Sequence, residues 1–274
     1  MACLVKSSNP MACYTAFLDH SQGKVLMWHD VARSAAPARR RRFAIIALLA
    51  MCGCAGKVVI PAVSPATNTG QVDLVDIATL VPDIALEIRY AGSDNFVGRP
   101  IDGYLAPKCL LLRPVAQALQ RVEASLRQQH LRMKLFDCYR PVRAVRNFVR
   151  WAEDLPDQRT KPYYYPKLDK RALLGDYIAP VSGHSRGATL DLTLLQCAAN
   201  DASCRPLDMG TDFDFFDPRA NTESPDVTEM QRANRERLRT AMTRQGFRNY
   251  PLEWWHYTLV PEPAPDRLYD VPVQ

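Results

Sequence analysis

The chain has 274 residues, of which 47% are hydrophobic and 23% are charged, enough apolar material for one sizeable core or two small ones. Its formal net charge of +6 comes largely from Arg39 to Arg42 and from the arginines of residues 232–248. Neither cluster shows the glycine and aromatic residues that are interleaved with basic ones on a nucleic-acid surface, so we interpret both as solvated and expect no nucleic-acid partner.

Residues 1–56 are expected to be an N-terminal extension and export signal. The basic run "ARRRR" precedes the nine-residue apolar run "FAIIALLAM", residues 43–51, and the small and thiol residues "CGCAG". This apolar run is too short for a bilayer core, which needs about 20 residues, whereas the order of the three regions is typical of a secretory signal. Cys54 or Cys52 resembles the cysteine that becomes lipidated in a lipoprotein signal, with ordinary cleavage as the alternative. We therefore expect a periplasmic or cell-envelope protein, lipid-anchored if one of these cysteines is modified.

A linker at residues 57–72 is expected to lead into a catalytic domain over residues 73–274. At 83–91, "DIALEIRYA" alternates apolar and polar residues, which predicts a half-buried strand. Pro114 suits the first turn of a helix over 114–129. We predict a strand over 133–139, "MKLFDCY", and a second helix over 141–154 that opens with Pro141.

The second half of the chain continues this irregular mixture. The strand predicted over 188–194, "ATLDLTL", places leucines on one face and Thr189, Asp191 and Thr193 on the other. The pattern "TEMQ" predicts a capping box for a helix over 228–245 that ends at Gly246, and "EWWHYTLV" at 253–260 is the last predicted strand. The order of the elements predicts a single α+β domain with a mainly antiparallel central sheet and flanking helices.

Four cysteines lie in the predicted domain, and an even number in an exported protein permits disulfides. Cys197 and Cys204 would close the short loop "CAANDASC", which leaves Cys109 and Cys138 as the other pair. Four buried free thiols and the two other pairings remain alternatives.

Two histidines stand near acidic residues that chemistry would use. His184 precedes Asp191 by seven residues, and His256 closes the motif "EWWH". Two imidazoles and one carboxylate form a three-ligand set that holds zinc and leaves a fourth position for water. Asp191 needs a partner because burying an unpaired carboxylate is costly. A metal ion and Arg186 are the two candidate partners.

Glu253 and Arg140 add the groups that amide hydrolysis needs. A carboxylate beside a metal, but not bound to it, can take a proton from the attacking water and pass it to the leaving amine. Glu253 stands three residues before His256, so this role requires a turn or bulge, because an ideal strand would place the two on opposite faces. Arg140, at a strand-to-helix junction before Pro141, can stabilise the oxyanion of the tetrahedral intermediate.

Five motifs in order carry a resemblance to a known family: "DNFVGRPIDGY", "DCYRPVRAV", "SGHSRGATLDLTL", "MGTDFDFFD" and "EWWHY". Over about residues 75–274 they closely resemble the zinc D-Ala-D-Ala dipeptidases of the vancomycin-resistance type. The resemblance implies that His184, Asp191 and His256 bind one Zn²⁺ ion. It also implies that Glu253 is the general base and that Arg140 stabilises the transition state.

The same resemblance implies the small dipeptide D-Ala-D-Ala as the substrate, hydrolysed to two D-Ala in the cell envelope. Asp214 would contact the substrate ammonium, and Ser182, Tyr90 and Tyr104 would line the pocket. The chain departs from the family at Gly183, where a second serine is common.

Two alternative functions are considered. One is a D,D-carboxypeptidase or peptidoglycan endopeptidase of the same superfamily, whose last motif usually has a different residue at the position of Trp254. The other is a non-catalytic, zinc-containing module that binds the cell wall. Glu253 and Arg140 argue against the second, because a binding module has no use for a base beside the metal.

Overall fold

The computed structural model describes residues 61–198 and 203–274, which belong to one compact unit. The predicted export signal, with Cys52 and Cys54, lies outside these residues, as does the start of the linker. Within the described part of the chain, no helix combines the length and the apolar character needed to cross a membrane. The predicted α+β class is confirmed.

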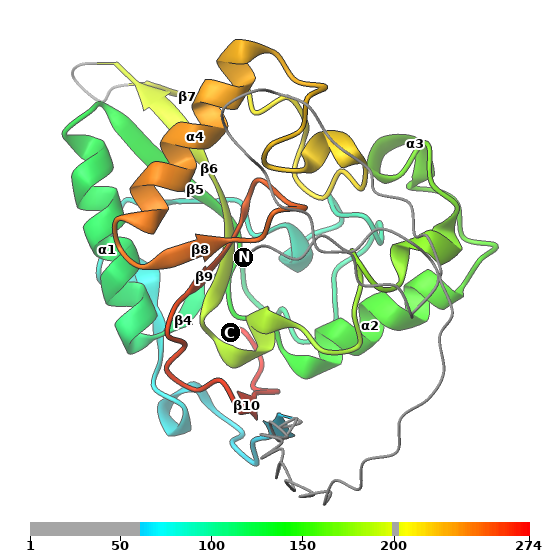
Figure 1. Cartoon of the computed structure of the whole chain (residues 1–274). Helices are drawn as coiled ribbons and strands as arrows, with labels where there is room; N and C mark the ends of the chain where they lie inside the picture. The colour runs from blue at the N-terminus through cyan, green and yellow to red at the C-terminus, as the bar shows by residue number, and fades with distance from the viewer. Residues whose placement is uncertain (1–60, 199–202) are drawn as a thin grey trace, which may run out of the picture. The chain divides into compact units, whose positions relative to one another are not determined.

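A six-stranded sheet forms the centre of the domain, with β3, β5, β6, β9 and β8 in spatial order and β7 paired to β6 (Figure 1). The pairing of β3 with β5 is parallel and the other four pairings are antiparallel, so the sheet is mixed but mainly antiparallel, as predicted. The strands are Ala85–Leu86 (β3), Leu131–Asp137 (β5), Thr189–Cys197 (β6), Cys204–Pro206 (β7), Phe247–Asn249 (β8) and His256–Leu259 (β9). Two short pairs flank this sheet: Ala62–Val63 (β1) with Arg267–Leu268 (β10), and Leu74–Asp76 (β2) with Leu110–Leu112 (β4).

Helices cover the sheet on both sides. In Figure 1, α1 and α4 lie side by side on one side of the sheet and α2 lies on the other. The α-helices are Arg113–Arg127 (α1), Val142–Glu153 (α2), Lys161–Tyr164 (α3) and Glu229–Thr243 (α4). Short 3₁₀ turns occupy Thr69–Gln71, Ile77–Thr79, Arg89–Ala91, Lys170–Leu173, Gly183–Arg186 and Pro218–Ala220. The capping box at Thr228 and Gln231 is present, and the chain leaves α4 through Gly246 at a φ of 88°.

Strand β6 runs through the middle of the core, with β5 and β9 on either side. All its residues except Gln196 are buried, so both of its faces are covered. The alternation places Leu190 and Leu192 on one face and Asp191 on the other, as predicted. A carboxylate is thereby held at the centre of the sheet.

The predicted strand over 83–91 is much shorter than expected. It pairs only at Ala85–Leu86, and Arg89–Ala91 form a 3₁₀ turn. The side-chain amide of Asn95 donates to the backbone carbonyls of Arg89, Gly92 and Arg99 at 3.3, 2.7 and 2.9 Å. These local hydrogen bonds replace the ladder that a strand would need.

Both disulfides form in the structure. Cys109 and Cys138 have Cα atoms 5.2 Å apart and connect the start of β4 to the segment after β5. Cys197 and Cys204, with Cα atoms 4.0 Å apart, close the β6–β7 hairpin. Of the pairings that the sequence left open, the structure therefore forms the one with the short loop.

Candidate active site

A row of three side chains crosses the sheet at its centre. Asp191 of β6 is directly paired with Asp137 of β5 on one side and with His256 of β9 on the other. The register of β5 shifts between Leu135 and Asp137, which brings Asp137 level with Asp191. Directly opposed residues have Cβ atoms about 4.5–5.5 Å apart, so the side chains of this row share one face of the sheet.

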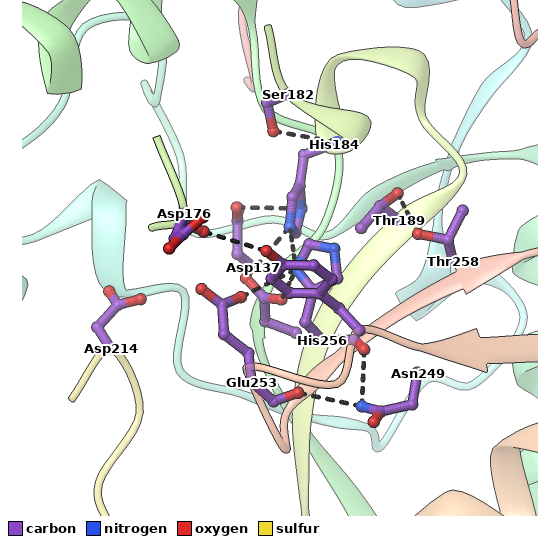
Figure 2. A network of polar contacts seen from close by, with 12 residues as sticks. Asp137, Asp176, Ser182, His184, Thr189, Asp214, Asn249, Glu253, His256 and Thr258 are labelled. Carbon is purple, nitrogen blue, oxygen red and sulfur yellow. Dashed lines mark hydrogen bonds and ion pairs between the residues drawn. The ribbon is translucent and has the colours of Figure 1, made fainter. Parts of the chain in front are cut away.

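His184 joins this row from the 3₁₀ turn Gly183–Arg186. Ser182 caps the turn, its hydroxyl accepting from the backbone N–H of His184 at 3.2 Å (Figure 2). Nδ1 of His184 donates to the carbonyl of Cys138 at 2.7 Å, which leaves Nε2 as the free acceptor. That atom lies 3.4 Å from Oδ2 of Asp191 and 3.3 Å from Nδ1 of His256.

These three residues form a group able to hold a metal ion. One ligand atom from each of His184, Asp191 and His256 lies within 4.8 Å of the others. Oδ1 of Asp191 is buried without a hydrogen bond from any described residue, although Nδ1 of His256 is 3.1 Å away. A buried carboxylate oxygen in this state needs a cation, and two imidazoles with one carboxylate suit zinc. The alternative partner, Arg186, instead forms an ion pair with Glu262.

The charges around the site support a bound cation. Burial lowers the pKa of His184, which favours the neutral imidazole that binds metals. Burial alone would raise the pKa of Asp191, but His184 and His256 together bring it below its ordinary value. Asp191 therefore stays ionised inside the protein.

Arg140 is fixed between the two carboxylates of the row. Its Nε donates to Oδ2 of Asp137 at 2.9 Å, and its Nη2 is 3.6 Å from Oδ2 of Asp191. The guanidinium carbon also lies 5.1 Å from the ring centroid of Tyr90 and 5.0 Å from that of Phe148. The side chain is thus oriented before any substrate arrives.

Asp137 is a site residue that the sequence analysis did not single out. It is fully buried, binds Arg140, and accepts from the hydroxyl of Tyr104 at 2.5 Å. The signal was present, because Asp137 stands three residues before Arg140 in "FDCYRP", at the end of an apolar strand. Tyr104 was expected to line the pocket, but the structure places it behind Asp137 instead, where it holds that carboxylate.

Glu253 lies in the turn before β9, so the backbone bend that its predicted role requires is present. The side-chain amide of Asn249 fixes the turn by donating to the carbonyls of Glu253 and His256 at 3.0 and 3.1 Å. Figure 2 shows the Glu253 carboxylate beside His256, and Oε2 is 3.4 Å from Nδ1 of that ring. Burial raises the pKa of Glu253 to about 7.

All the predicted site residues except Tyr104 line one cavity of about 270 Å³. Asp214 enters it from residues 209–221, which we call the Asp214 segment. Its carboxylate is buried and accepts from the hydroxyl of Tyr90 at 2.9 Å. Burial raises the pKa of Asp214 well above its ordinary value. Asp214 is therefore a buried acid of the cavity in addition to Glu253, and it is not one of the metal ligands.

The family model described as D-Ala-D-Ala dipeptidase matches residues 70–274. The chain belongs to this dipeptidase family. The D-alanyl-D-alanine dipeptidase of Streptomyces coelicolor is 40% identical over 206 residues, which cover 75% of this chain and 99% of that one. The enzyme of the same name from Enterococcus faecium is 36% identical over 196 residues, 71% of this chain and 95% of its own. A solved mutant of the vancomycin-resistance D,D-pentapeptidase VanY, in complex with Zn(II), overlaps with a TM-score of 0.35 at 14% identity, covering 74% of this chain and 87% of that one.

As a member of the D-Ala-D-Ala dipeptidase family, the chain is a zinc metallopeptidase.

The purified domain should bind about one zinc per chain, and His256→Ala should lose most of it, because two ligands hold zinc far more weakly than three. Elemental analysis after dialysis measures this. His130→Ala, which removes an exposed histidine, is the matched control and should keep its zinc. Undiminished zinc in His256→Ala would contradict the ligand set.

Proposed function

We propose that this cavity hydrolyses the free dipeptide D-Ala-D-Ala to two molecules of D-Ala. One observation carries the proposal: three features meet in one cavity of about 270 Å³. They are the metal-binding group, the Glu253 carboxylate 3.4 Å from Nδ1 of His256, and the guanidinium of Arg140, which Asp137 fixes. Sites for drug-sized ligands range from about 300 to 1,000 Å³, so this cavity suits a smaller substrate.

Three residues would hold the metal: His184 through Nε2, His256 through Nδ1, and Asp191 through a carboxylate oxygen. When bound, zinc supplies polarisation of the scissile carbonyl and acidification of a water molecule. Glu253 takes the proton of the attacking water and delivers it to the departing amine nitrogen. The new C–O bond thus forms and the C–N bond breaks without a free charge on the leaving group.

Arg140 stabilises the oxyanion of the tetrahedral intermediate. Its ion pair with Asp137 and its contacts with two aromatic rings hold the guanidinium in place. A donor that is fixed beforehand stabilises developing charge without a reorganisation cost at the moment of reaction.

Glu253→Gln should retain zinc and lose most of its turnover, by about 10²-fold or more, because the amide keeps the shape of the side chain but cannot accept the proton. Steady-state kinetics with D-Ala-D-Ala and metal analysis of the same sample test both statements. Normal turnover in this variant would remove Glu253 from the reaction.

The preference for a free dipeptide rests on Asp214. In the structure its buried carboxylate has one side-chain hydrogen bond, from Tyr90. The ammonium of a free dipeptide would supply the missing opposite charge, whereas an acylated amino end would add bulk and leave the acid without a cation. Trp254, present in the "EWWHY" motif, also favours the dipeptidase over a D,D-carboxypeptidase.

Competition between D-Ala-D-Ala and N-acetyl-D-Ala-D-Ala should show a preference of at least about a hundredfold in kcat/KM, because the free ammonium forms a buried ion pair with Asp214, whereas an acylated amino end adds bulk and forms none. Asp214→Asn should narrow this ratio by weakening the binding of the free dipeptide. Asp212→Asn, at an exposed position of the same segment, is the matched control and should preserve it. Comparable values for both substrates would favour the carboxypeptidase function.

We also propose that the enzyme is exported to the periplasm or cell envelope and attached to the membrane through Cys54 or Cys52. The order of basic, apolar and small residues before position 57 supports export. The two disulfides of the domain support it as well, because such bonds persist in oxidising compartments.

Fractionation of cells that express the full chain should place it in the envelope, with both disulfides present in a non-reducing peptide map. Substituting serine for the lipidated cysteine, Cys54 or Cys52, should release the protein from the membrane fraction. A cytosolic protein with four free thiols would contradict export.

A further inference from the structure

Arg235 of α4 departs from the expected solvated basic face. Its side chain is fully buried, whereas neighbouring arginines of the same helix, such as Arg232 and Arg237, are exposed. Burial lowers the pKa of the Arg235 guanidinium to about 10, so it still carries its charge at neutral pH. A buried charge on this helix requires an explanation.

Within residues 61–198 and 203–274, all three hydrogen bonds of this guanidinium go to the backbone of the Asp214 segment. Nε donates to the carbonyl of Met209 at 2.7 Å, Nη1 to that of Asn221 at 2.6 Å, and Nη2 to that of Arg219 at 2.9 Å. Met209 is the first residue of the segment, and the other two lie at its end. One planar, forked side chain thus ties together both ends of the segment, which the single ammonium of a lysine could not do in the same geometry.

Two further side chains of α4 reach the same place. Asn234 donates to the carbonyl of Asp208 at 2.9 Å, and Gln231 donates to the carboxylate of Asp208 at 2.8 Å. Positions 231, 234 and 235 lie on one face of a helix. This face of α4 therefore serves as an anchor for the chain that leads into the Asp214 segment.

Asp214 itself needs such an anchor. Its φ of 59° lies in the left-handed region, which residues other than glycine rarely adopt and which persists only where the surrounding structure enforces it. Its only side-chain hydrogen bond from a described residue, that of Tyr90, joins it to a different part of the chain. The conformation of Asp214 is therefore imposed by how the segment is held.

An apolar residue could fill the space of Arg235 without the cost of burying a charge. The charged side chain adds the three hydrogen bonds to the Asp214 segment. The metal-binding residues, by contrast, lie on β6, on β9 and on the turn Gly183–Arg186, which the hydrogen bonds of Arg235 do not reach. Arg235 therefore contacts the segment that carries Asp214 into the cavity, and it makes no hydrogen bond to the elements that carry the described metal-binding residues.

We propose that Arg235 is a positioning residue for substrate selection: by tying both ends of the Asp214 segment to α4, it holds the Asp214 carboxylate where a free substrate ammonium meets it. The inference rests on the proposed role of Asp214. According to this proposal, the choice of substrate also depends on Arg235, a buried residue of α4 that does not line the cavity.

The test compares Arg235→Met and Arg235→Lys with the matched control Arg239→Met, one turn further along α4, where the guanidinium pairs with Glu223 and Glu236 near the surface. For each holoenzyme, kcat/KM is measured for D-Ala-D-Ala and for N-acetyl-D-Ala-D-Ala, together with zinc content. Both Arg235 variants should lose at least about tenfold in selectivity, mainly through a higher KM for the free dipeptide, because several hydrogen bonds to the segment are lost. Zinc content should be unchanged, and the control should behave as the wild type.

Amide hydrogen exchange provides a readout that does not depend on activity. Exchange in residues 209–221 should accelerate in the Arg235 variants and not in Arg239→Met. If Arg235→Met does not fold, Asn234→Ala removes one anchor at Asp208 and should produce a smaller change of the same kind.

The outcomes separate this inference from the function on which it rests. A wild-type enzyme without preference for the free dipeptide overturns the proposed role of Asp214 and this inference with it. A selective wild type whose selectivity survives in Arg235→Met overturns this inference alone. An equal loss on both substrates also overturns it, since that result shows a general effect on catalysis.

Discussion

The buried carboxylate of Asp191 is the constraint on which the rest of the site depends. Strand β6 is covered on both faces, so this charge is largely shielded from water and must be compensated by neighbouring groups. Asp137, directly opposite on β5, adds a second buried acid. Two adjacent carboxylates can stay buried only where cations surround them, and that positive charge comes from Arg140 and from a metal ion held by Asp191 and the two histidines.

The metal-binding residues and Asp214, the residue proposed to select the substrate, lie on different parts of the fold. The metal-binding residues are held by strand register and by a capped turn, which fix side chains more firmly than loops do. The Asp214 segment is irregular and depends on contacts from outside: Tyr90 binds its acid, and α4 holds its ends. The two parts meet where the backbone N–H of Trp254, next to Glu253, donates to the carbonyl of Ala220 at 3.0 Å.

Local patterns predicted the class of the fold, three of the described helices and four strands of the central sheet, whereas the position of Asp137 and the burial of Arg235 depend on residues distant in sequence. Hydrophobic periodicity and capping signals located α1, α2 and α4, but not the short α3, and placed Asp191 on the face opposite the leucines of β6. The motifs identified the three metal ligands that the structure brings together. The level position of Asp137 depends on a register shift between β5 and β6, which neither strand reveals by itself. The burial of Arg235 likewise depends on carbonyl groups outside its own helix. The early end of β3 has a local cause, the side-chain amide of Asn95, which the alternation of apolar and polar residues does not reveal.

The central claim is that Asp191 and two histidines on three separate elements form one zinc site with Glu253 beside it. A crystal structure of the zinc-loaded domain, with the metal located by anomalous scattering, tests this most directly. The account predicts zinc about 2.0–2.2 Å from Nε2 of His184, Nδ1 of His256 and an Asp191 oxygen, with Glu253 nearby but not bound. Zinc bound elsewhere, or bound through Glu253 in place of Asp191, would contradict it.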